Sequence, residues 1–214
     1  MSDPPESAPK PDQLTQTAEG PLIHQTPRVP LLLDGVLLDD PEEITSYNGT
    51  PLYYTPIGSF PTVALAVFTT REAMLSARTD EAKVSLELGS TDADSITLPI
   101  VGTIPLGPPP PPTIPDEARF CEHQYQQGDS FTLPPDRAYS DLRGLSYGGT
   151  LGIGSDSWND AITSTAQCRF AVSLFEAIDY VGSELRVPAG GSVPDMVPLG
   201  WNDRASSVVN WGFA

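Results

Sequence analysis

Cysteine and histidine are scarce in this sequence. Its 214 residues include two cysteines, Cys121 and Cys168, and two histidines, His24 and His123. Zinc sites are mostly built from closely spaced Cys and His ligands, and because that spacing is missing here, no zinc site is expected. Two cysteines by themselves do not indicate a redox compartment.

Basic residues and long apolar runs are also few. Lys and Arg number 11 against 28 Asp and Glu, which gives a formal net charge of -17. This excess repels phosphate backbones, so we expect no nucleic-acid partner, but it attracts divalent cations. No run of about 18 apolar residues occurs, so no membrane span is expected. The N-terminus lacks the features of a secretory signal, which favours the cytoplasm; leaderless export stays open and the localisation is otherwise unknown.

The composition predicts a mainly β protein. Long helices are disfavoured because the chain holds 24 Pro and 18 Gly. Four regions follow one another along the sequence. We predict a disordered tail over residues 1–28, a small α+β module of unknown role over 29–106, a polyproline linker over 107–117 and a β domain over 118–214.

The module at residues 29–106 alternates turn signals with short apolar runs. Turns are predicted at Asp34-Gly35 and Asn48-Gly49. Asp40 is expected to cap a short helix that begins at Pro41, and Thr69 with Glu72 fits a capping box for a helix over about 70–78. The predicted strands cover residues 31–33, 36–38, 52–54, 63–68 and 83–88.

The most informative pattern is a repeat of seven residues. Residues 158–164 read Trp-Asn-Asp-Ala-Ile-Thr-Ser, and residues 201–207 read Trp-Asn-Asp-Arg-Ala-Ser-Ser. Both copies gather oxygen-bearing side chains around two variable positions. Oxygen ligands at this density suit a hard cation such as Ca²⁺.

A second repeated pattern opens each half of the β domain. Residues 121–128 read Cys-Glu-His-Gln-Tyr-Gln-Gln-Gly, and residues 175–182 read Phe-Glu-Ala-Ile-Asp-Tyr-Val-Gly. Further along, Ser-Asp-Leu at residues 140–142 parallels Pro-Asp-Met at residues 194–196. A repeat unit of about 40–50 residues predicts two related supersecondary motifs within one fold.

Together these residues resemble the βγ-crystallin family of microbial type. The family's unit is a four-stranded Greek key that opens with an acidic, aromatic hairpin around a Gly. It closes with Asn/Asp-Asn/Asp-x-x-Ser/Thr-Ser, and two keys form one β-sandwich. The resemblance covers about residues 118–214. It implies a mainly β fold, in which a C-terminal two-Greek-key β-sandwich is preceded by the small α+β module and the disordered tail.

The resemblance also implies a crossed site for two Ca²⁺ ions, in which each motif loop serves both ions. Asp160 and Asp203 are expected to supply carboxylates, and Thr163 and Ser206 are expected to supply hydroxyls. The other implied residues contribute mainly backbone carbonyls or loop shape: Glu122, Asn159, Ala161, Glu176, Asn202 and Arg204. One carboxylate for each ion predicts moderate affinity.

Three positions depart from the family pattern. Gln126 replaces an aromatic residue in the first hairpin, where the neighbouring Tyr125 could shift into its place. Glu184 replaces the usual Ser of the second hairpin. The Gly-rich insertion at residues 148–154 is predicted to weaken the first site.

Two pairs of residues are expected to serve the core. Trp158 and Trp201, at the start of each motif loop, are predicted to anchor the loops to the sandwich. In this family Cys121 and Cys168 would fall on neighbouring strands of the first key. A disulfide and a pair of buried thiols both stay open.

No enzyme is expected. Gly144-Leu-Ser146-Tyr-Gly148 matches the nucleophile elbow of serine hydrolases, but both histidines precede Ser146, and that fold needs a later one. The predicted function is calcium binding that stabilises the fold. The alternative is an interaction protein with a protein partner, either of protease-inhibitor or toxin type or a structural subunit of a larger assembly.

Overall fold

The computed structural model describes residues 4–11, 14, 22–58, 63–77, 115–148, 156–166 and 168–213. Its strands and helices are short, and the longest helices among the described residues are the 3-10 helix Pro41–Tyr47 and the α-helix Arg71–Ala77, with seven residues each. Within these described residues, no helix is both long and apolar enough to cross a membrane. The predicted strand at 83–88, residues 107–114 of the predicted polyproline linker and most of the Gly-rich insertion lie outside the described residues.

The C-terminal half is built from two strand sets of the same kind. The first set comprises β6 (Ala118–Cys121), β7 (Ser130–Leu133), β8 (Arg137–Tyr139) and β11 (Ser164–Thr165). The second set comprises β12 (Val172–Phe175), β13 (Glu184–Val187), a single bridge at Val193 and β14 (Ser207–Asn210). A small hairpin of β9 (Ser146–Tyr147) and β10 (Asp156–Ser157) projects from the first set.

The third strand of each set pairs with the last strand of the other set. β8 pairs with β14, the last strand of the second set, and Val193 pairs with Thr165 in β11, the last strand of the first. One sheet therefore contains β11, β6 and β7, while β8, β14, β12 and β13 belong to the other. This exchange makes two Greek keys interdependent, because neither key can complete its sheet alone. The predicted two-key β-sandwich is confirmed.

The N-terminal module has most of its predicted elements. Strands β2 (Leu31–Leu33) and β3 (Val36–Leu37) form a hairpin, and the 3-10 helix Pro41–Tyr47 begins after the Asp40 cap, whose side chain accepts from the amide of Glu42. Strands β4 (Tyr53–Ile57) and β5 (Ala64–Phe68) follow, and then helix α1 (Arg71–Ala77).

The predicted cap of α1 is wrong by one residue. The Thr70 hydroxyl accepts from the Ala73 amide at 3.2 Å, so Thr70 caps the helix. Thr69 instead donates its hydroxyl to Asp34, at 2.9 Å, and thereby holds the β2–β3 turn. The sequence pattern could not separate two adjacent threonines because both can act as helix caps.

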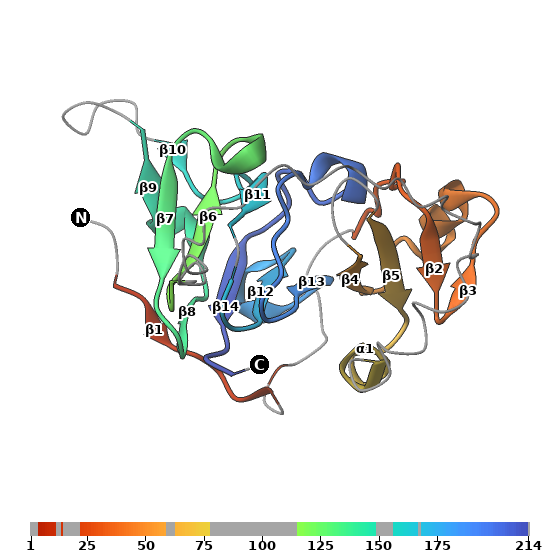
Figure 1. Cartoon of the computed structure of the whole chain (residues 1–214), viewed down its shortest axis with the longest axis horizontal. Helices are drawn as coiled ribbons and strands as arrows, with labels where there is room; N and C mark the ends of the chain where they lie inside the picture. Colours follow the sequence, from red (N-terminus) through yellow and green to blue (C-terminus); the bar gives the residue numbers. More distant parts are fainter. Residues whose placement is uncertain are drawn as a thin grey trace, which may run out of the picture.

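The two halves of the chain share one sheet. β4 pairs in parallel with β13, which aligns Tyr53 with Glu184 and Tyr54 with Leu185, and this pairing extends the sandwich sheet to nine strands. Figure 1 shows β13 and β4 meeting between the C-terminal strands on one side and β5, β2 and β3 on the other. Leu31 also belongs to the same buried cluster as Leu174 and Trp201. A single sheet and a single core therefore join residues that are far apart in the sequence.

Parts of residues 1–28, the predicted tail, pack against the rest of the chain. β1 (Glu6–Ser7) pairs antiparallel with β8. Further on, the amide of His24 donates to the side chain of Asn48 at 2.7 Å, and the ring of His24 is buried. Sequence reasoning missed these contacts because the segment has few apolar residues.

Candidate functional site

The opening hairpins of the two keys have the same backbone shape. The 3-10 turn at Gln124–Gln126 corresponds to that at Ile178–Tyr180. In the first hairpin φ is 58° at Tyr125 and 60° at Gln126, and in the second it is 57° at Asp179 and 61° at Tyr180. Two consecutive non-glycine residues with positive φ cost conformational free energy, so surrounding contacts must hold both turns.

The last serine of each motif supplies those contacts. Ser164 donates its hydroxyl to the His123 carbonyl at 2.6 Å and accepts from the Gln126 amide at 3.1 Å. Ser207 does the same in the second key, with 2.7 Å to the Ala177 carbonyl and 3.2 Å from the Tyr180 amide. Both serines are fully buried. Each motif loop is therefore locked to the hairpin that opens its own key.

The two motif loops lie against each other and are bonded crosswise. The Asp160 amide donates to the Ala205 carbonyl at 2.9 Å, and the Asp203 amide donates to the Ile162 carbonyl at 3.4 Å. The aspartates themselves have φ of 55° and 53°. Asp tolerates this left-handed region better than most residues, which explains the residue type at both positions.

The motif side chains reach across the same contact. The Ser206 hydroxyl donates to Asp160 Oδ1 at 3.3 Å, and the Thr163 hydroxyl donates to Asp203 Oδ1 at 3.4 Å. Each hydroxyl therefore contacts the carboxylate of the other motif loop. Asn159 and Asn202 instead donate their side-chain amides to the adjacent aspartates, at 2.6 Å and 2.5 Å.

The environment of the two aspartates disfavours their charged form. Although each residue is exposed as a whole, partial burial of the carboxylate is the largest cause that raises the pKa of Asp160 and of Asp203. The negative charges of Asp203 and Glu176 raise the pKa of Asp160 further. A cation between the loops would relieve both effects because it stabilises ionised carboxylates.

The remaining predicted residues surround these loops. Ala161 is buried beside Asp160. The Glu122 amide donates to the Asp129 carbonyl at 3.0 Å, and the Glu176 amide makes the matching bond to the Ser183 carbonyl at 3.0 Å. The two glutamates are therefore equivalent positions of the two hairpins.

Arg204 is buried and pairs with the Glu176 side chain. Its guanidinium donates to Glu176 Oε1 at 2.9 Å and to the Gly200 carbonyl at 2.8 Å, and it lies 4.8 Å from the centre of the Trp201 ring. The other carboxylate oxygen of Glu176, Oε2, is buried without a hydrogen-bond partner. Glu176 therefore offers its side-chain Oε2 as an acceptor, in addition to the backbone carbonyl expected from the sequence.

Comparison with known proteins gives structural neighbours only. No family model matches the sequence, and no curated protein matches it. A βγ-crystallin domain from Clostridium beijerinckii is 25% identical, with 45% of this chain and 98% of that chain covered and a TM-score of 0.34. An archaeal βγ-crystallin is 21% identical (44% and 95% covered, TM-score 0.33), and the βγ-crystallin from Ciona intestinalis is also 21% identical (44% and 98% covered, TM-score 0.33).

The C-terminal half resembles a βγ-crystallin domain. Because the TM-scores lie below 0.5, the two-key topology is inferred from the strand pairings and from the duplicated contacts alone. The duplication extends to the connections between strands. The side chains of Asp141 and Asp195 each accept at 2.9 Å from the amide two residues later, as the parallel between residues 140–142 and 194–196 predicts.

Gln126 and Glu184, which depart from the βγ-crystallin pattern, make different contacts in the structure. Gln126 takes the position equivalent to Tyr180, while Tyr125 is 63% exposed, so the expected shift of Tyr125 into that place is wrong. Gln126 instead donates its side-chain amide to the Thr165 carbonyl at 3.3 Å. Glu184 is fully buried and paired with Arg71 of α1, with 2.7 Å between Oε2 and Nε.

The tryptophans and cysteines are all buried. Trp158 and Trp201 have exposed fractions of 2% and 0%, so their predicted role as core anchors is confirmed. Cys121 and Cys168 are free thiols. Burial raises the pKa of both thiols, to about 12 for Cys168, so both are protonated at neutral pH.

The donor chemistry of the crossed loops fits a hard cation better than a soft one. Among the described residues, no three or more His, Cys, Asp or Glu side chains are grouped so that they could hold a metal ion. The loops offer one carboxylate each, hydroxyls and backbone carbonyls. Calcium accepts six to eight such oxygens in irregular geometry, so these residues are compatible with it.

Proposed function

We propose that the crossed motif loops bind two Ca²⁺ ions and that this binding stabilises the two-key domain. The observation that carries the proposal is the reciprocal pairing of Thr163 with Asp203 and of Ser206 with Asp160. Each loop brings a carboxylate and a hydroxyl to the same contact. The residues proposed to hold the ions are the ten predicted from the sequence: Glu122, Asn159, Asp160, Ala161, Thr163, Glu176, Asn202, Asp203, Arg204 and Ser206.

Electrostatics supports the proposal independently of the resemblance. The pKa of both aspartates is raised, first by burial, and Asp160 also feels the charges of Asp203 and Glu176. Neighbouring carboxylates repel one another, and among these three described carboxylates only Glu176 is paired with a cation, through Arg204 at 2.9 Å. A divalent ion would offset this repulsion, and the net charge of -17 favours its approach from solution.

The stabilising effect follows from where the loops are attached. Ser164 and Ser207 fix each loop to its own hairpin, while the crossed bonds join the loops of different keys. An ion held by both loops would therefore link the two keys directly. Ligand binding to the folded state alone adds stability, about 2.7 kcal/mol at a free ligand concentration of 100 times Kd.

Calorimetric titration of the chelator-treated full chain tests the proposal. We expect two bound Ca²⁺ ions per chain with moderate affinity, and much weaker binding of Mg²⁺, because Mg²⁺ demands near-ideal octahedral geometry. Asp39→Asn is the matched control, since Asp39 is exposed and distant in sequence from both loops. Absence of both heat and a melting-temperature shift at millimolar Ca²⁺ would falsify the proposal.

A further inference from the structure

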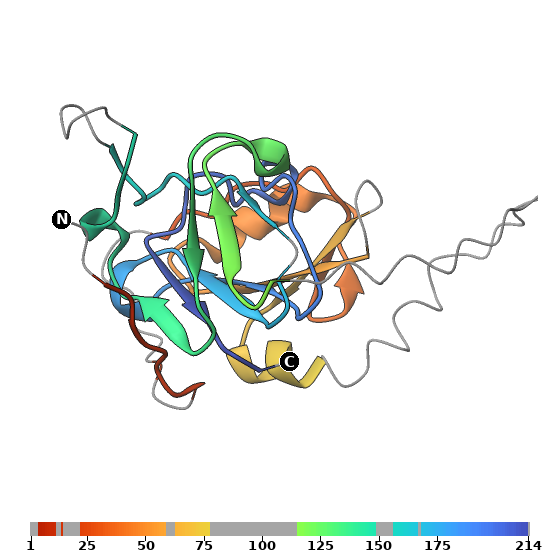
Figure 2. The ribbon, with the colours of Figure 1, turned by 60° about the vertical axis from the view of Figure 1, so that its left-hand side comes forward.

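Residues 6–11, called the strap here, lie along the edge of the nine-stranded sheet. Glu6 pairs with Ala138 and Ser7 with Arg137, and the Ala8 amide donates to the Asp136 carbonyl at 3.0 Å. Figures 1 and 2 show β1 beside β8 at this end of the sheet. Without the strap, β8 would be an edge strand with unpaired backbone groups, the arrangement to which another extended chain can add.

The strap is held by both halves of the protein. The Tyr180 hydroxyl of the C-terminal half donates to the Glu6 carboxylate. Arg71, from α1 of the N-terminal module, donates to the Pro11 carbonyl at 2.8 Å.

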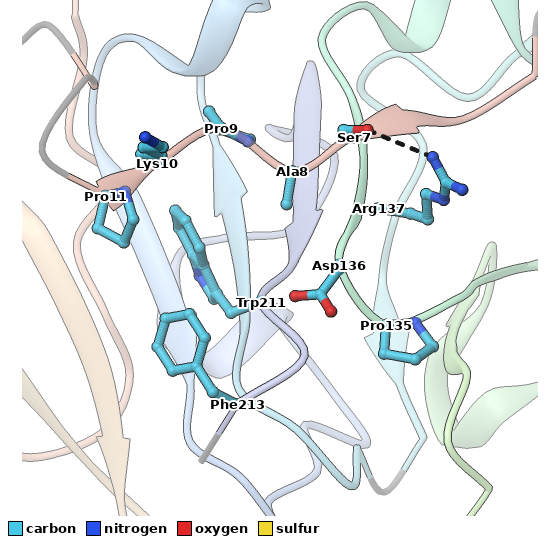
Figure 3. Close-up of a pocket in the computed structure, with 10 residues that line it drawn as sticks. All are labelled: Ser7, Ala8, Pro9, Lys10, Pro11, Pro135, Asp136, Arg137, Trp211 and Phe213. Atoms are coloured by element: carbon cyan, nitrogen blue, oxygen red, sulfur yellow. Dashed lines mark hydrogen bonds between the residues drawn. The ribbon is translucent and has the colours of Figure 1, made fainter.

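A hollow remains beneath the strap. It has a volume of about 550 Å³, and Asp136, Trp211 and Phe213 form its inner wall. Figure 3 shows the Ala8 methyl group pointing into this space from the strap, between Trp211 and Asp136. Small-molecule and side-chain pockets commonly fall in the range of about 300–1,000 Å³, so a single methyl group fills little of this one.

The side chains of the strap therefore fill the groove poorly. Glu6, Ser7, Lys10 and Pro11 are exposed, and β1 is two residues long. Ala8 packs against the buried cluster that contains Trp211, while Phe213 is 46% exposed. The strap pairs with β8 through its backbone, but it leaves the hollow open to a larger side chain.

We propose that this groove binds an extended peptide segment of a partner protein, which displaces the strap and pairs antiparallel with β8. The peptide would carry a large aliphatic side chain where Ala8 lies, with an acidic residue two positions earlier. The backbone donor at the Ala8 position is required, because it satisfies the Asp136 carbonyl. Main-chain pairing supplies affinity in this mode of recognition, and the side-chain pocket supplies specificity.

The test uses the full chain and synthetic peptides. Ala8→Pro in the protein removes the amide donor and so releases the strap. The probe is a fluorescent peptide of residues 4–11 that carries Ala8→Leu, compared with the unchanged sequence by anisotropy. We expect the released protein to bind the Leu peptide roughly 10-fold or more tightly than the unchanged peptide, and more tightly than the wild-type protein does.

Control variants and peptides distinguish binding in the groove from nonspecific binding. Phe213→Ser should weaken binding of the Leu peptide, whereas Ser130→Ala in β7, outside the hollow, should not. A peptide with Ala8→Pro should not bind, because it lacks the donor for Asp136. Thermal unfolding of each variant checks that it is folded, and the wild-type protein should rank the peptides in the same order at higher concentrations.

Several results would overturn the proposal. One is equal binding of the two peptides, and another is binding that Phe213→Ser leaves unchanged. Failure of the Leu peptide to bind the folded Ala8→Pro protein at millimolar concentration is a third. Dimerisation of the wild-type protein that Ala8→Pro abolishes would assign the groove to a second copy of the chain instead. None of these outcomes depends on calcium binding.

Discussion

Ser206 donates a hydrogen bond to Asp160 of the other motif loop, with 3.3 Å between Oγ and Oδ1 across 46 sequence positions. Thr163 and Asp203 form the mirror pair at 3.4 Å across 40 positions. These two bonds make the candidate site a property of both Greek keys. Loss of either aspartate is therefore expected to affect the oxygens offered by both loops.

The first prediction concerns that coupling. Asp160→Asn and Asp203→Asn should each reduce the calcium-induced rise in melting temperature by more than half, because one loop serves both ions. The double variant should lose little more than either single variant, since coupled sites are not additive. Melting curves with Ca²⁺ and with chelator measure this effect. Independent halves of the rise in the two single variants would contradict a crossed site.

The second prediction concerns the serines that lock the hairpins. Ser164→Ala and Ser207→Ala should each lower the free energy of unfolding by about 1–3 kcal/mol, because each removes two part-buried hydrogen bonds that contribute about 0.5–1.5 kcal/mol apiece. Ser46→Ala is the control, as its hydroxyl bonds only locally to the Glu43 carbonyl at the surface. Urea denaturation measures the free energy of unfolding of these variants and of the control. A cost equal to that of the control would mean that the hairpins hold their positive φ angles without these bonds.

The third prediction concerns the ion pair that joins the two halves. Arg71→Ala should cost up to about 3–5 kcal/mol, because it removes the nearer cation, at 2.7 Å, from the fully buried Glu184 carboxylate and leaves Arg186 at 3.9 Å. Arg143→Ala breaks an exposed pair with Asp141 and should leave the free energy of unfolding nearly unchanged. Chemical denaturation measures the free energy of unfolding of both variants. Two separate unfolding transitions in the wild-type protein would show that the halves do not share one cooperative core.

The fourth prediction uses the pKa of His24. Its Nε2–H faces the carbonyls of Tyr47 and Thr50, and its Nδ1 accepts from the Tyr54 hydroxyl at 2.8 Å. Burial lowers the pKa of this ring below its ordinary value of 6.5, so the folded state favours the neutral form. The stability that the neutral ring contributes is present above pH 6.5 and is lost as pH falls through the lowered pKa.

The measurement compares the two histidines of the chain. The free energy of unfolding of the wild-type protein should fall between pH 7 and pH 5, and His24→Gln should flatten this slope. His123→Gln is the matched control variant, because the His123 side chain is 62% exposed. A wild-type slope that survives His24→Gln would assign the pH dependence to other groups.

Local features were predictable because they depend on residues adjacent in sequence. Asp34-Gly35 predicts the β2–β3 turn, and Asp40 with Pro41 predicts the start of a 3-10 helix. The two Trp-Asn-Asp segments likewise predict two equivalent loops. Where two neighbours could play one role, as with Tyr125 and Gln126, sequence alone did not decide between them.

Long-range pairings were not predictable from the residues that make them. The parallel contact of β4 with β13 joins Leu52 to Ser183 across 131 positions, and nothing near either residue indicates the other. The same holds for His24 and Tyr54, which lie beside the second motif loop. The burial of Glu184 has a sequence signal, an acid where the family has Ser, but its partner Arg71 comes from the other half of the chain.

The duplicated hairpins and loops and the oxygen-rich chemistry of the motifs follow from the amino-acid sequence, because turn preference and ligand type belong to individual residues. Which loop faces which, how the keys exchange third strands and how one sheet continues from β1 to β3 depend on the folded chain. Those outcomes depend on complementary edges and on shared burial. The crossed site and the groove under the strap therefore exist only in the folded chain.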